Sequence, residues 1–464
     1  MRIRSILIAN RGEIAVRIIR TCHNLGIETV LAASDADLDA VPARQADRTV
    51  RIGPARSSES YLNVDAIMEA AAAAKVDAIH PGYGFLSENV RLAHACRARG
   101  MVFIGPTEAQ LEAVGDKLRA RQHAIAAGLP VVPGGPVGSS TEAIALAEKI
   151  GWPVLVKAVG GGGGRGMKLV AEPARMAEVV ELAMAEAHSA FADSRLYLER
   201  FVTSARHVEV QIIGDGGDVI HLGDRDCSIQ RRYQKLVEEA PAPGLPERTC
   251  AAMRAAAVAF GRHLGYLGLG TVEFLYDRGR DEFYFLEMNA RIQVEHPVTE
   301  AITGLDLVAE QIGIAEGRKL RLRQEEIDFN GHAIECRINA EDWARDFQPS
   351  VGTVDAAIFP VGPGVRVDTH IEAGSRVPPF YDSLLAKIIV HGADRSAAIE
   401  RLRLALADCD VRGVVTNRDM HLALLRQAEF VQGGVDTAYL PRFLEQWGAG
   451  CGRLTVPVSG PAPG

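Results

Sequence analysis

Apolar strand-like segments alternate with helix-like segments over residues 3–104, and this alternation restricts the fold more than any other feature of the sequence. Strands are expected at residues 3–9, 29–33, 78–80 and 102–104, with helices at residues 13–24 and in an alanine-rich segment that ends near Lys75. Parallel strands need long crossover connections, and helices usually supply them. The pattern therefore predicts an α/β domain with a doubly wound, largely parallel sheet.

The remaining sequence divides into three parts. A helix at residues 116–127 and a connector at residues 128–130 come first. A small module follows, with strands at residues 153–158, 167–170 and 195–199 and a helix at residues 173–190. Longer strands and hairpins then predict an antiparallel α+β domain. We expect domains at residues 1–115, 131–203 and 204–448, a linker at 116–130, and a disordered tail, rich in Pro, Gly and Ser, at 449–464.

The charge balance and the cysteine content exclude several classes of protein. With 59 acidic and 51 basic residues the formal net charge is −8, which is a poor match for nucleic acid. The seven cysteines are scattered and none forms a C-x-x-C pair, so a reduced, cytoplasmic protein is expected. No apolar segment is long enough to cross a membrane as a helix.

A glycine-rich loop follows the expected strand that ends near Lys157. Glycines at residues 160–164 and 166 let backbone N–H groups close around phosphate oxygens, and a lysine at the strand end adds a compact positive charge. Arginine carries most of the positive charge in this sequence, so a retained lysine is informative. The loop is not a Walker A motif, because no Gly-Lys-Ser/Thr follows. A flexible hairpin turn is the alternative interpretation.

Two adjacent acidic strands indicate a metal site. They should form a hairpin, and a register that pairs Tyr276 with Tyr284 places Glu273 directly opposite Glu287. Facing carboxylates destabilise a ladder unless a cation lies between them. With Asn289 on the same face, two carboxylates and an amide oxygen suit Mg²⁺. Solvated surface carboxylates are the alternative interpretation.

The second of these strands continues with a period of two. Its polar face carries, in order, Glu287, Asn289, Arg291, Gln293 and Glu295, and the residues between them are apolar. One face thus offers metal ligands, then a guanidinium and an amide for an anion, then a carboxylate able to act as a base. An exposed sheet face would also alternate. The turn-forming pair at residues 296–297 limits the extended interpretation beyond Gln293.

Two further polar clusters are candidates. Residues 230–238 form a dense polar run, including Lys235 and Glu238, that could reach phosphate or bicarbonate or could equally be a solvated loop. Farther along, Glu335, Arg337 and Asn339 share one face of an expected strand. Arg337 could bind an anion there, or it could pair with Glu335.

Taken together, these segments closely resemble biotin carboxylases of the ATP-grasp superfamily, and the resemblance covers the chain up to residue 445. The matching segments are ILIANRGEIAVRIIR (residues 6–20), HPGYGFLSEN (80–89), IGP and GDK (within 104–117), KAVGGGGGRGM (157–167), RHVEVQ (206–211), RDCSIQRR (225–232), VEEAPAPG (237–244), RIQVEHPVTE (291–300) and ECRINAED (335–342). The implied architecture is an ATP-grasp fold, with an N-terminal biotin carboxylase domain at residues 1–115, a lid subdomain at 131–203, and the ATP-grasp and C-terminal domain at 204–448.

The resemblance implies a role for each candidate residue. ATP would be bound at its phosphates by Lys117, Lys157 and a mobile glycine loop with Gly163 and Gly164, at its adenine by Glu199, Arg200, Phe201 and Val202, and elsewhere by His207, Tyr233, Glu273 and Glu287. Mg²⁺ or Mn²⁺ would be held by Glu273, Glu287 and Asn289. Bicarbonate would be fixed by Lys235, Arg291, Gln293 and the Val294 backbone.

The implied chemistry makes Arg291, Glu295, Lys235 and Arg337 catalytic. Glu295 would deprotonate bicarbonate, which would attack the γ-phosphate of ATP and form carboxyphosphate. Breakdown of carboxyphosphate would release CO₂, and phosphate would take the proton from the ureido nitrogen of biotin. Arg337 would stabilise the enolate-like biotin.

Some positions depart from the family pattern. Tyr233 stands where most relatives have a histidine beside the nucleotide, and Ala290 replaces a more common threonine. Trp343 and Gln348 replace the usual proline and leucine. The family resemblance implies a homodimer, although Asn24 stands where a dimeric relative has an acidic interface residue.

The implied reaction is the first half-reaction of a biotin-dependent carboxylase for acetyl-CoA or another acyl-CoA. Because the sequence has no A-M-K-M biotin-attachment segment, a separate biotin carboxyl carrier protein and a separate carboxyltransferase are the expected partners, with no nucleic acid or membrane. Two alternatives stay open: another ATP-grasp ligase with a different acceptor, and a catalytically silent nucleotide-binding subunit, which only Tyr233 favours.

Overall fold

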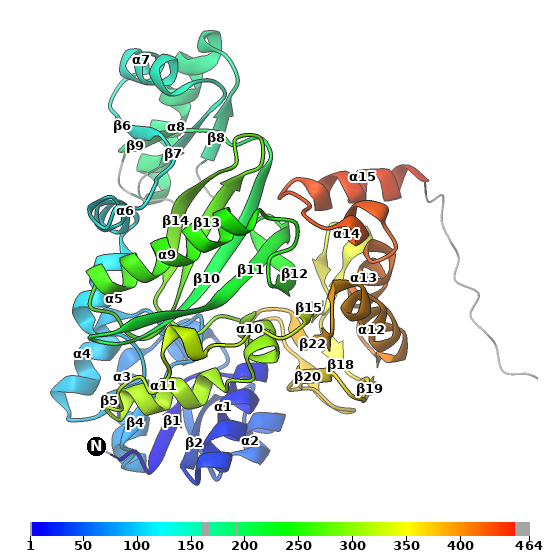
Figure 1. Ribbon diagram of the computed structural model, residues 1–464. Helices are drawn as coiled ribbons and strands as arrows, with labels where there is room; N and C mark the ends of the chain where they lie inside the picture. The colour runs from blue at the N-terminus through cyan, green and yellow to red at the C-terminus, as the bar shows by residue number, and fades with distance from the viewer. Residues whose placement is uncertain (1, 159–166, 192–193, 451–464) are drawn as a thin grey trace, which may run out of the picture.

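The N-terminal domain is built on a five-stranded parallel sheet. A computed structural model describes residues 2–158, 167–191 and 194–450 of the chain. The sheet order is β3-β2-β1-β4-β5, which confirms the predicted parallel sheet (Figure 1). Its elements are β1 (Ser5–Ile8), α1 (Gly12–Leu25), β2 (Glu28–Ser34), α2 (Val41–Gln45), β3 (Arg48–Gly53), α3 (Val64–Ala74), β4 (Ala78–His80), α4 (Val90–Ala98) and β5 (Val102–Phe103). Strand β3 was not predicted, because its sequence RTVRIG lies at a half-exposed sheet edge and is largely polar.

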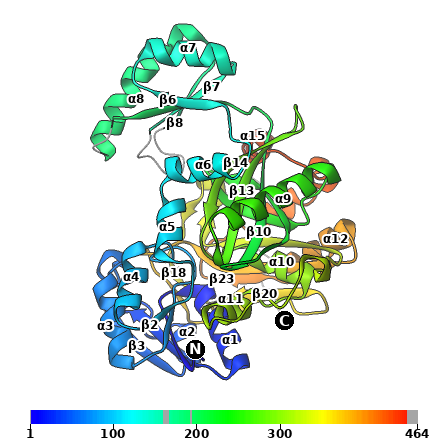
Figure 2. The same cartoon turned by 60° about the vertical axis from the view of Figure 1, so that its left-hand side comes forward.

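Two helices connect this domain to a small module. Helices α5 (Glu108–Gly115) and α6 (Lys117–Ala126) are separated by Asp116, whose side chain caps α6 by accepting from the Arg119 backbone N–H. The module has a four-stranded sheet in the order β6-β9-β7-β8 and stands apart from the other domains in both views (Figures 1 and 2). Its elements are β6 (Gly134–Val137), α7 (Ser140–Ile150), β7 (Val154–Ala158), β8 (Met167–Val170), α8 (Met176–Phe191) and β9 (Leu196–Arg200).

An eight-stranded antiparallel sheet forms the centre of the molecule, as the sequence predicted for the region after residue 203. Its order is β14-β13-β10-β11-β12-β15-β22-β20. The strands are β10 (Ala205–Asp215), β11 (Val219–Arg231), β12 (Gln234–Ala240), β13 (Leu267–Asp277), β14 (Glu282–Asn289), β15 (His332–Asn339), β20 (Val365–Thr369) and β22 (Leu384–Gly392), and the helices packed on them include α9 (Glu247–His263), α10 (His296–Thr303) and α11 (Leu307–Ala315). Because β12 pairs with β15, strands from distant parts of the sequence share one continuous polar face.

The C-terminal part packs helices against the far end of this sheet. Its apolar core joins Ile388 of β22 to Leu402, Leu424 and Phe430. The helices are α12 (Arg395–Asp408), α13 (Arg418–Leu424), α14 (Ala428–Gln432) and α15 (Tyr439–Gly450), and the short strands are β16 (Glu341–Asp342), β17 (Gln348–Pro349), β18 (Gly352–Thr353), β19 (Ala356–Ile358), β21 (Arg376–Val377) and β23 (Asp410–Arg412). Helix α15 continues to Gly450, so the first two residues of the predicted tail are helical, and residues 451–464 lie outside the described residues.

The predicted hairpin of β13 and β14 forms, but with a different register at its outer end. Tyr276 pairs with Phe283 rather than with Tyr284, so that part of the prediction was wrong by one residue. A β-bulge on β14 absorbs the difference, because Leu286 is skipped between the pairs Glu273–Glu287 and Phe274–Phe285. Glu273 therefore still lies directly opposite Glu287, as expected.

Within the part of the chain that the structure describes, no helix is both long and apolar enough to span a bilayer.

Candidate active site

The segment that follows β14 carries three candidate side chains. The sequence predicted an extended strand as far as Gln293, but β14 ends at Asn289, and residues 290–295 are irregular before α10 begins at His296. A turn therefore replaces the last part of the expected strand. The apolar residues still point inward, since Ala290 and Ile292 are fully buried. The polar side chains converge through the turn rather than along a pleated face.

Glu295 lies between two cations. Its Oε1 is 2.6 Å from Lys235 Nζ and its Oε2 is 2.9 Å from Arg337 Nη2. The carboxylate is almost fully buried. Burial raises the pKa of such a group, but Lys235 and Arg337 outweigh it and hold the pKa of Glu295 well below its usual range. Both cations therefore favour the ionised form of the Glu295 carboxylate.

Lys235 contacts three carboxylates at once. Besides Glu295, its Nζ lies 2.6 Å from Glu209 Oε2 and 3.1 Å from Glu273 Oε1. Burial lowers the pKa of a lysine, but these carboxylates raise the pKa of Lys235 well above its usual value. The dense polar run at residues 230–238 is therefore split: Lys235 and Glu238 point into the site, whereas Arg232 and Tyr233 form the exposed turn of the β11–β12 hairpin.

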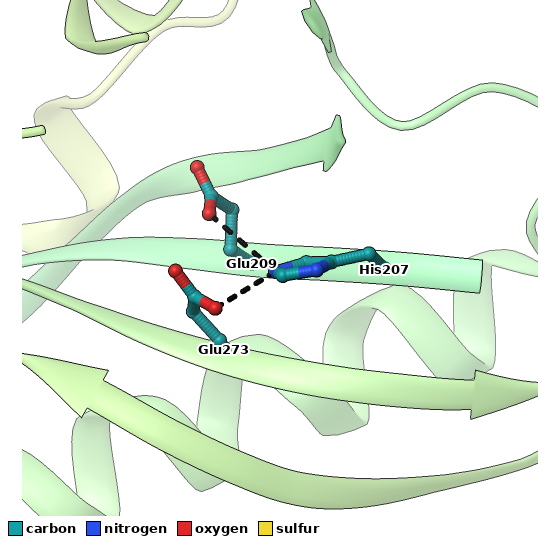
Figure 3. Close-up of side chains that lie close together, drawn as sticks. All are labelled: His207, Glu209 and Glu273. Carbon is teal, nitrogen blue, oxygen red and sulfur yellow. Dashed lines mark ion pairs between the residues drawn. The ribbon is translucent and has the colours of Figure 1, made fainter. Parts of the chain in front are cut away.

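The carboxylates of the β10–β13 pair also surround a histidine (Figure 3). His207 Nε2 lies 2.9 Å from Glu273 Oε2 and 3.9 Å from Glu209 Oε2. Burial lowers the pKa of His207, but Glu273 outweighs this and raises it. His207 and Lys235 thus both lie against Glu209 and Glu273 and offset part of the negative charge of these carboxylates.

Glu273, Glu287 and Asn289 form the candidate metal site. Burial and the facing Glu273 raise the pKa of Glu287. Its nearest cation is Lys117, whose Nζ is 4.0 Å from Glu287 Oε2. Asn289 Nδ2 donates to Glu273 Oε1 at 2.8 Å, which keeps the amide beside the carboxylates. Two opposed carboxylates with excess negative charge fit a hard divalent cation.

Gln293 is held by an arginine that the sequence analysis did not single out. Gln293 Nε2 donates to Glu273 Oε1, and its Oε1 accepts from Arg225 Nη2, both at 2.8 Å. Arg225 is fully buried and also donates to Glu209 at 2.6 Å. Glu209 was missed too, although His207, Glu209 and Gln211 alternate along β10 in the same period-two pattern that identified the Glu287 face.

Arg291 lies at the edge of the cluster. Its Nε donates to Glu88 Oε2 at 3.0 Å, and its Nη2 donates to Asn289 Oδ1 at 2.6 Å. Glu88 belongs to the N-terminal domain and was another missed residue. It also accepts from the Ala290 backbone N–H at 2.9 Å, so one carboxylate fixes both the start of the irregular segment and the guanidinium.

Arg337 does not hydrogen bond with Glu335, which was one of the two interpretations left open. It donates through Nε to Glu238 Oε1 at 2.6 Å and contacts Glu295 as described. Burial raises the pKa of Glu238 to about 7 even though Arg337 opposes this. Glu335 lies opposite Glu238 in the β12–β15 ladder, and burial raises the pKa of Glu335 well above its usual value.

The expected nucleotide residues lie where the small module meets the large sheet. Lys157 of β7 forms an ion pair with Glu199 of β9, and Arg200 donates to the Tyr284 hydroxyl of β14. Phe201 and Val202 follow β9, and the buried Val202 packs with Tyr284. Tyr233 is 63% exposed and is not brought together with the other candidates. Gly163 and Gly164 lie outside the described residues.

The chain matches three family descriptions in succession. Residues 2–111 match "Biotin carboxylase, N-terminal domain", residues 116–323 match "Carbamoyl-phosphate synthase L chain, ATP binding domain", and residues 335–442 match "Biotin carboxylase C-terminal domain". The biotin carboxylase of Pseudomonas aeruginosa is 50% identical over 443 residues, which cover 95% of this chain and 98% of that protein.

Solved structures agree with this match. A biotin carboxylase from Campylobacter jejuni, described as a complex with β-γ-ATP, has a TM-score of 0.91 at 45% identity, covering 95% of this chain and 99% of that one. The biotin carboxylase domain of 2-oxoglutarate carboxylase from Hydrogenobacter thermophilus, described as a dimer with MgADP, ADP and bicarbonate, has a TM-score of 0.89 at 43% identity, covering 95% and 98%. The fold, the buried carboxylate–cation cluster and these matches lead to one conclusion: the chain belongs to the biotin carboxylase family of ATP-grasp ligases.

Proposed function

We propose that this chain uses ATP and bicarbonate to carboxylate biotin on a carrier protein, as the first half-reaction of a biotin-dependent carboxylase. The observation that carries the proposal is the buried Glu295 carboxylate, held at 2.6 Å from Lys235 and 2.9 Å from Arg337. Such a carboxylate could deprotonate bicarbonate, and the two cations beside it could stabilise the negative charge that develops on the reacting groups.

ATP would bind between the small module and the large sheet. Lys117 and Lys157 would neutralise its phosphates together with the loop that contains Gly163 and Gly164. Residues 199–202 would contact the adenine, and His207 and Tyr233 are further proposed contacts. Glu273, Glu287 and Asn289 would hold Mg²⁺ or Mn²⁺, which would supply positive charge to the phosphate oxygens when bound. The excess negative charge of the opposed carboxylates supports this assignment.

Bicarbonate would be fixed next to the base. Lys235, Arg291, Gln293 and the Val294 backbone would hold the anion, and Glu295 would take its proton. A carbonate oxygen would then attack the γ-phosphorus, the bond to ADP would break, and carboxyphosphate would form. Lys235 supports this role because it is anchored by Glu209 and Glu273 and is therefore preorganised.

Biotin would be carboxylated beside Arg337. Carboxyphosphate would release CO₂, and the phosphate would take the proton from the ureido nitrogen. The nitrogen would then form its bond to CO₂. Arg337 would stabilise the negative charge on the ureido oxygen, a role supported by its fixed orientation on Glu238.

We propose that the parent enzyme carboxylates acetyl-CoA or another acyl-CoA, with a separate biotin carboxyl carrier protein and carboxyltransferase, and that the chain forms a homodimer. The family resemblance supports these partners, and the H. thermophilus domain, which is described as a dimer, supports the assembly. Asn24 is exposed at the end of α1, so it remains available for a contact. Light scattering of the purified chain tests the dimer, and carboxylation assays with candidate transferases test the acceptor.

ADP formation by the purified chain tests the reaction. With MgATP, turnover should require bicarbonate and rise when biotin or its carrier protein is added. Glu295→Gln should abolish this turnover, whereas Glu429→Gln, a change of the same kind at an exposed carboxylate of α14, should leave it intact. Binding of ATP without any bicarbonate-dependent turnover, with free biotin and with the carrier, would support a silent subunit instead. Turnover that needs a different acceptor would support another ATP-grasp ligase.

A further inference from the structure

Lys387 is a buried lysine outside the proposed set of site residues. It lies in β22, its side chain is fully buried, and it is one of few lysines in an arginine-rich sequence. An unpaired ammonium group is very unfavourable in such a place, so its contacts indicate why it is tolerated. Its Nζ lies 3.1 Å from Glu13 Oε1 and donates to the Val294 backbone carbonyl at 2.8 Å.

Glu13 brings the N-terminal domain into this contact. It lies in the first turn of α1 and is also fully buried. The Tyr83 hydroxyl, from the same domain, donates to the Glu13 oxygen that faces Lys387. The carboxylate therefore has a fixed position, and Lys387 links it across the domain boundary to the segment that follows β14.

The Val294 carbonyl belongs to the peptide that joins Val294 to Glu295. That peptide lies in the irregular segment, where no strand ladder holds the backbone. A fixed peptide restricts the Val294 backbone, which would contact bicarbonate. It also restricts the Cα atom of Glu295 and so the position of the Glu295 side chain. At the other end of the segment, Glu88 fixes the Ala290 N–H at 2.9 Å. The two contacts hold the segment at both ends.

We propose that Lys387, oriented by Glu13, is a positioning residue for the bicarbonate site. This inference rests on the proposed function. Lys387 does not touch bicarbonate; it holds the peptide that presents the Val294 backbone and Glu295. Other charged groups face Lys387 as well. Arg337, opposite it on β15, contacts Glu238 and Glu295, and Asp368, opposite it on β20, pairs with Arg366. The buried Glu335 and His296 also lie within electrostatic reach of Lys387, but neither forms a hydrogen bond with it.

The test measures the KM for bicarbonate and the KM for MgATP in three variants. Lys387→Met keeps the apolar stem and removes the donor, and Glu13→Gln with Lys387→Met avoids leaving a buried carboxylate alone. Because the Val294 backbone would contact bicarbonate, displacing this peptide should raise the KM for bicarbonate roughly tenfold or more in both variants, while the KM for MgATP stays near the wild-type value. Lys319→Met, at a lysine that is 74% exposed, is the control and should change neither KM.

Hydrogen exchange supplies a readout that does not need activity. In the ligand-free Lys387→Met protein, amides of residues 290–296 should exchange faster, while those of β10 and β13 stay as in the wild type. Inactive wild-type protein would refute the proposed function, and the exchange result would still decide whether Lys387 holds the segment. An unchanged bicarbonate KM, unchanged exchange, equal rises in both KM values, or failure of both variants to fold would each overturn the positioning role.

Discussion

Glu273 and Glu287 face each other directly across the β13–β14 ladder, and Glu273 is the one that Lys235 and His207 compensate. Glu287 is left with Lys117 at 4.0 Å as its nearest cation. The asymmetry means that one of the two carboxylates is already neutralised by the protein. The other is the carboxylate that a divalent cation would neutralise, which makes Glu287 the more informative position to change.

Replacing Glu287 by Gln should have opposite effects on the metal-free protein and on the protein with Mg²⁺. Without metal, the melting temperature should stay equal or rise slightly, because relief of a facing like-charge pair is worth about 0.2–1 kcal/mol. With Mg²⁺, the variant should bind ATP more weakly than the wild type. Calorimetric titration with and without Mg²⁺ measures this, and Glu429→Gln is the matched control. A metal-independent loss of ATP affinity would contradict the metal role.

Arg337→Lys should separate the two halves of the reaction. A lysine cannot reproduce the forked contact with Glu238 and Glu295, so charge at the ureido oxygen would lose its partner. Biotin-stimulated turnover should fall by roughly a hundredfold, in line with loss of one oxyanion donor. Bicarbonate-dependent ATP hydrolysis without biotin should fall much less. Equal loss of both rates would show that Arg337 acts before biotin enters.

Arg225→Met should lower the free energy of unfolding, because it removes several buried hydrogen bonds at once. Each N–H of this buried guanidinium is used, by Glu209, Gln211, Thr271, Gln293 and Thr299. Removing Arg225 breaks its buried ion pair with Glu209, and breaking such a pair costs about 3–5 kcal/mol. Urea denaturation measures the loss. Arg280→Met, at a guanidinium that is 56% exposed, should stay within about 0.5 kcal/mol of the wild type.

His421 should make the protein less stable in acid. It is buried behind Arg337, whose carbonyl is 2.9 Å from its Nε2, and burial lowers the pKa of His421 from 6.5 to about 4. As the pH falls below 6.5, the unfolded chain binds a proton that the folded chain excludes. The stabilisation is therefore complete above pH 6.5 and is lost toward pH 4, at about 1.4 kcal/mol per pH unit.

The comparison with His421→Gln isolates this contribution. The difference in unfolding free energy between wild type and variant should shrink as the pH falls from 7 to 4, by about 3 kcal/mol at most. Chemical denaturation at several pH values measures it. A difference that does not vary with pH would show that His421 is not the responsible group.

Local patterns identified most of the site, but only where neighbours in space are also neighbours in sequence. Glu273 and Glu287 were predicted to oppose each other because a hairpin brings them together. The strand was expected to continue to Gln293 because side-chain alternation alone does not distinguish a pleated strand from a turn that buries its apolar residues. Tyr276 was paired one residue out of register, since the sequence gives no sign of the bulge.

The missed residues come from distant segments. Glu88, Glu209, Arg225 and Lys387 reach the cluster from four different elements or loops, and no spacing in the sequence relates them to Glu295. Arg337 illustrates the same limit: Glu335 is two residues away, yet the guanidinium bonds to Glu238 across the ladder. The order of strands in the large sheet decides these contacts, and that order emerges only when the chain has folded.

The link between Glu13 and Lys387 bears on how the protein is made. The N-terminal domain and the segments that carry Lys235 and Glu295 leave the ribosome well before β22 does. A nascent chain at that stage already contains the base and most of its anion-binding partners, but the cation beneath Val294 has not yet been synthesised. The bicarbonate site can therefore be completed only after β22 has been synthesised and has packed against α1.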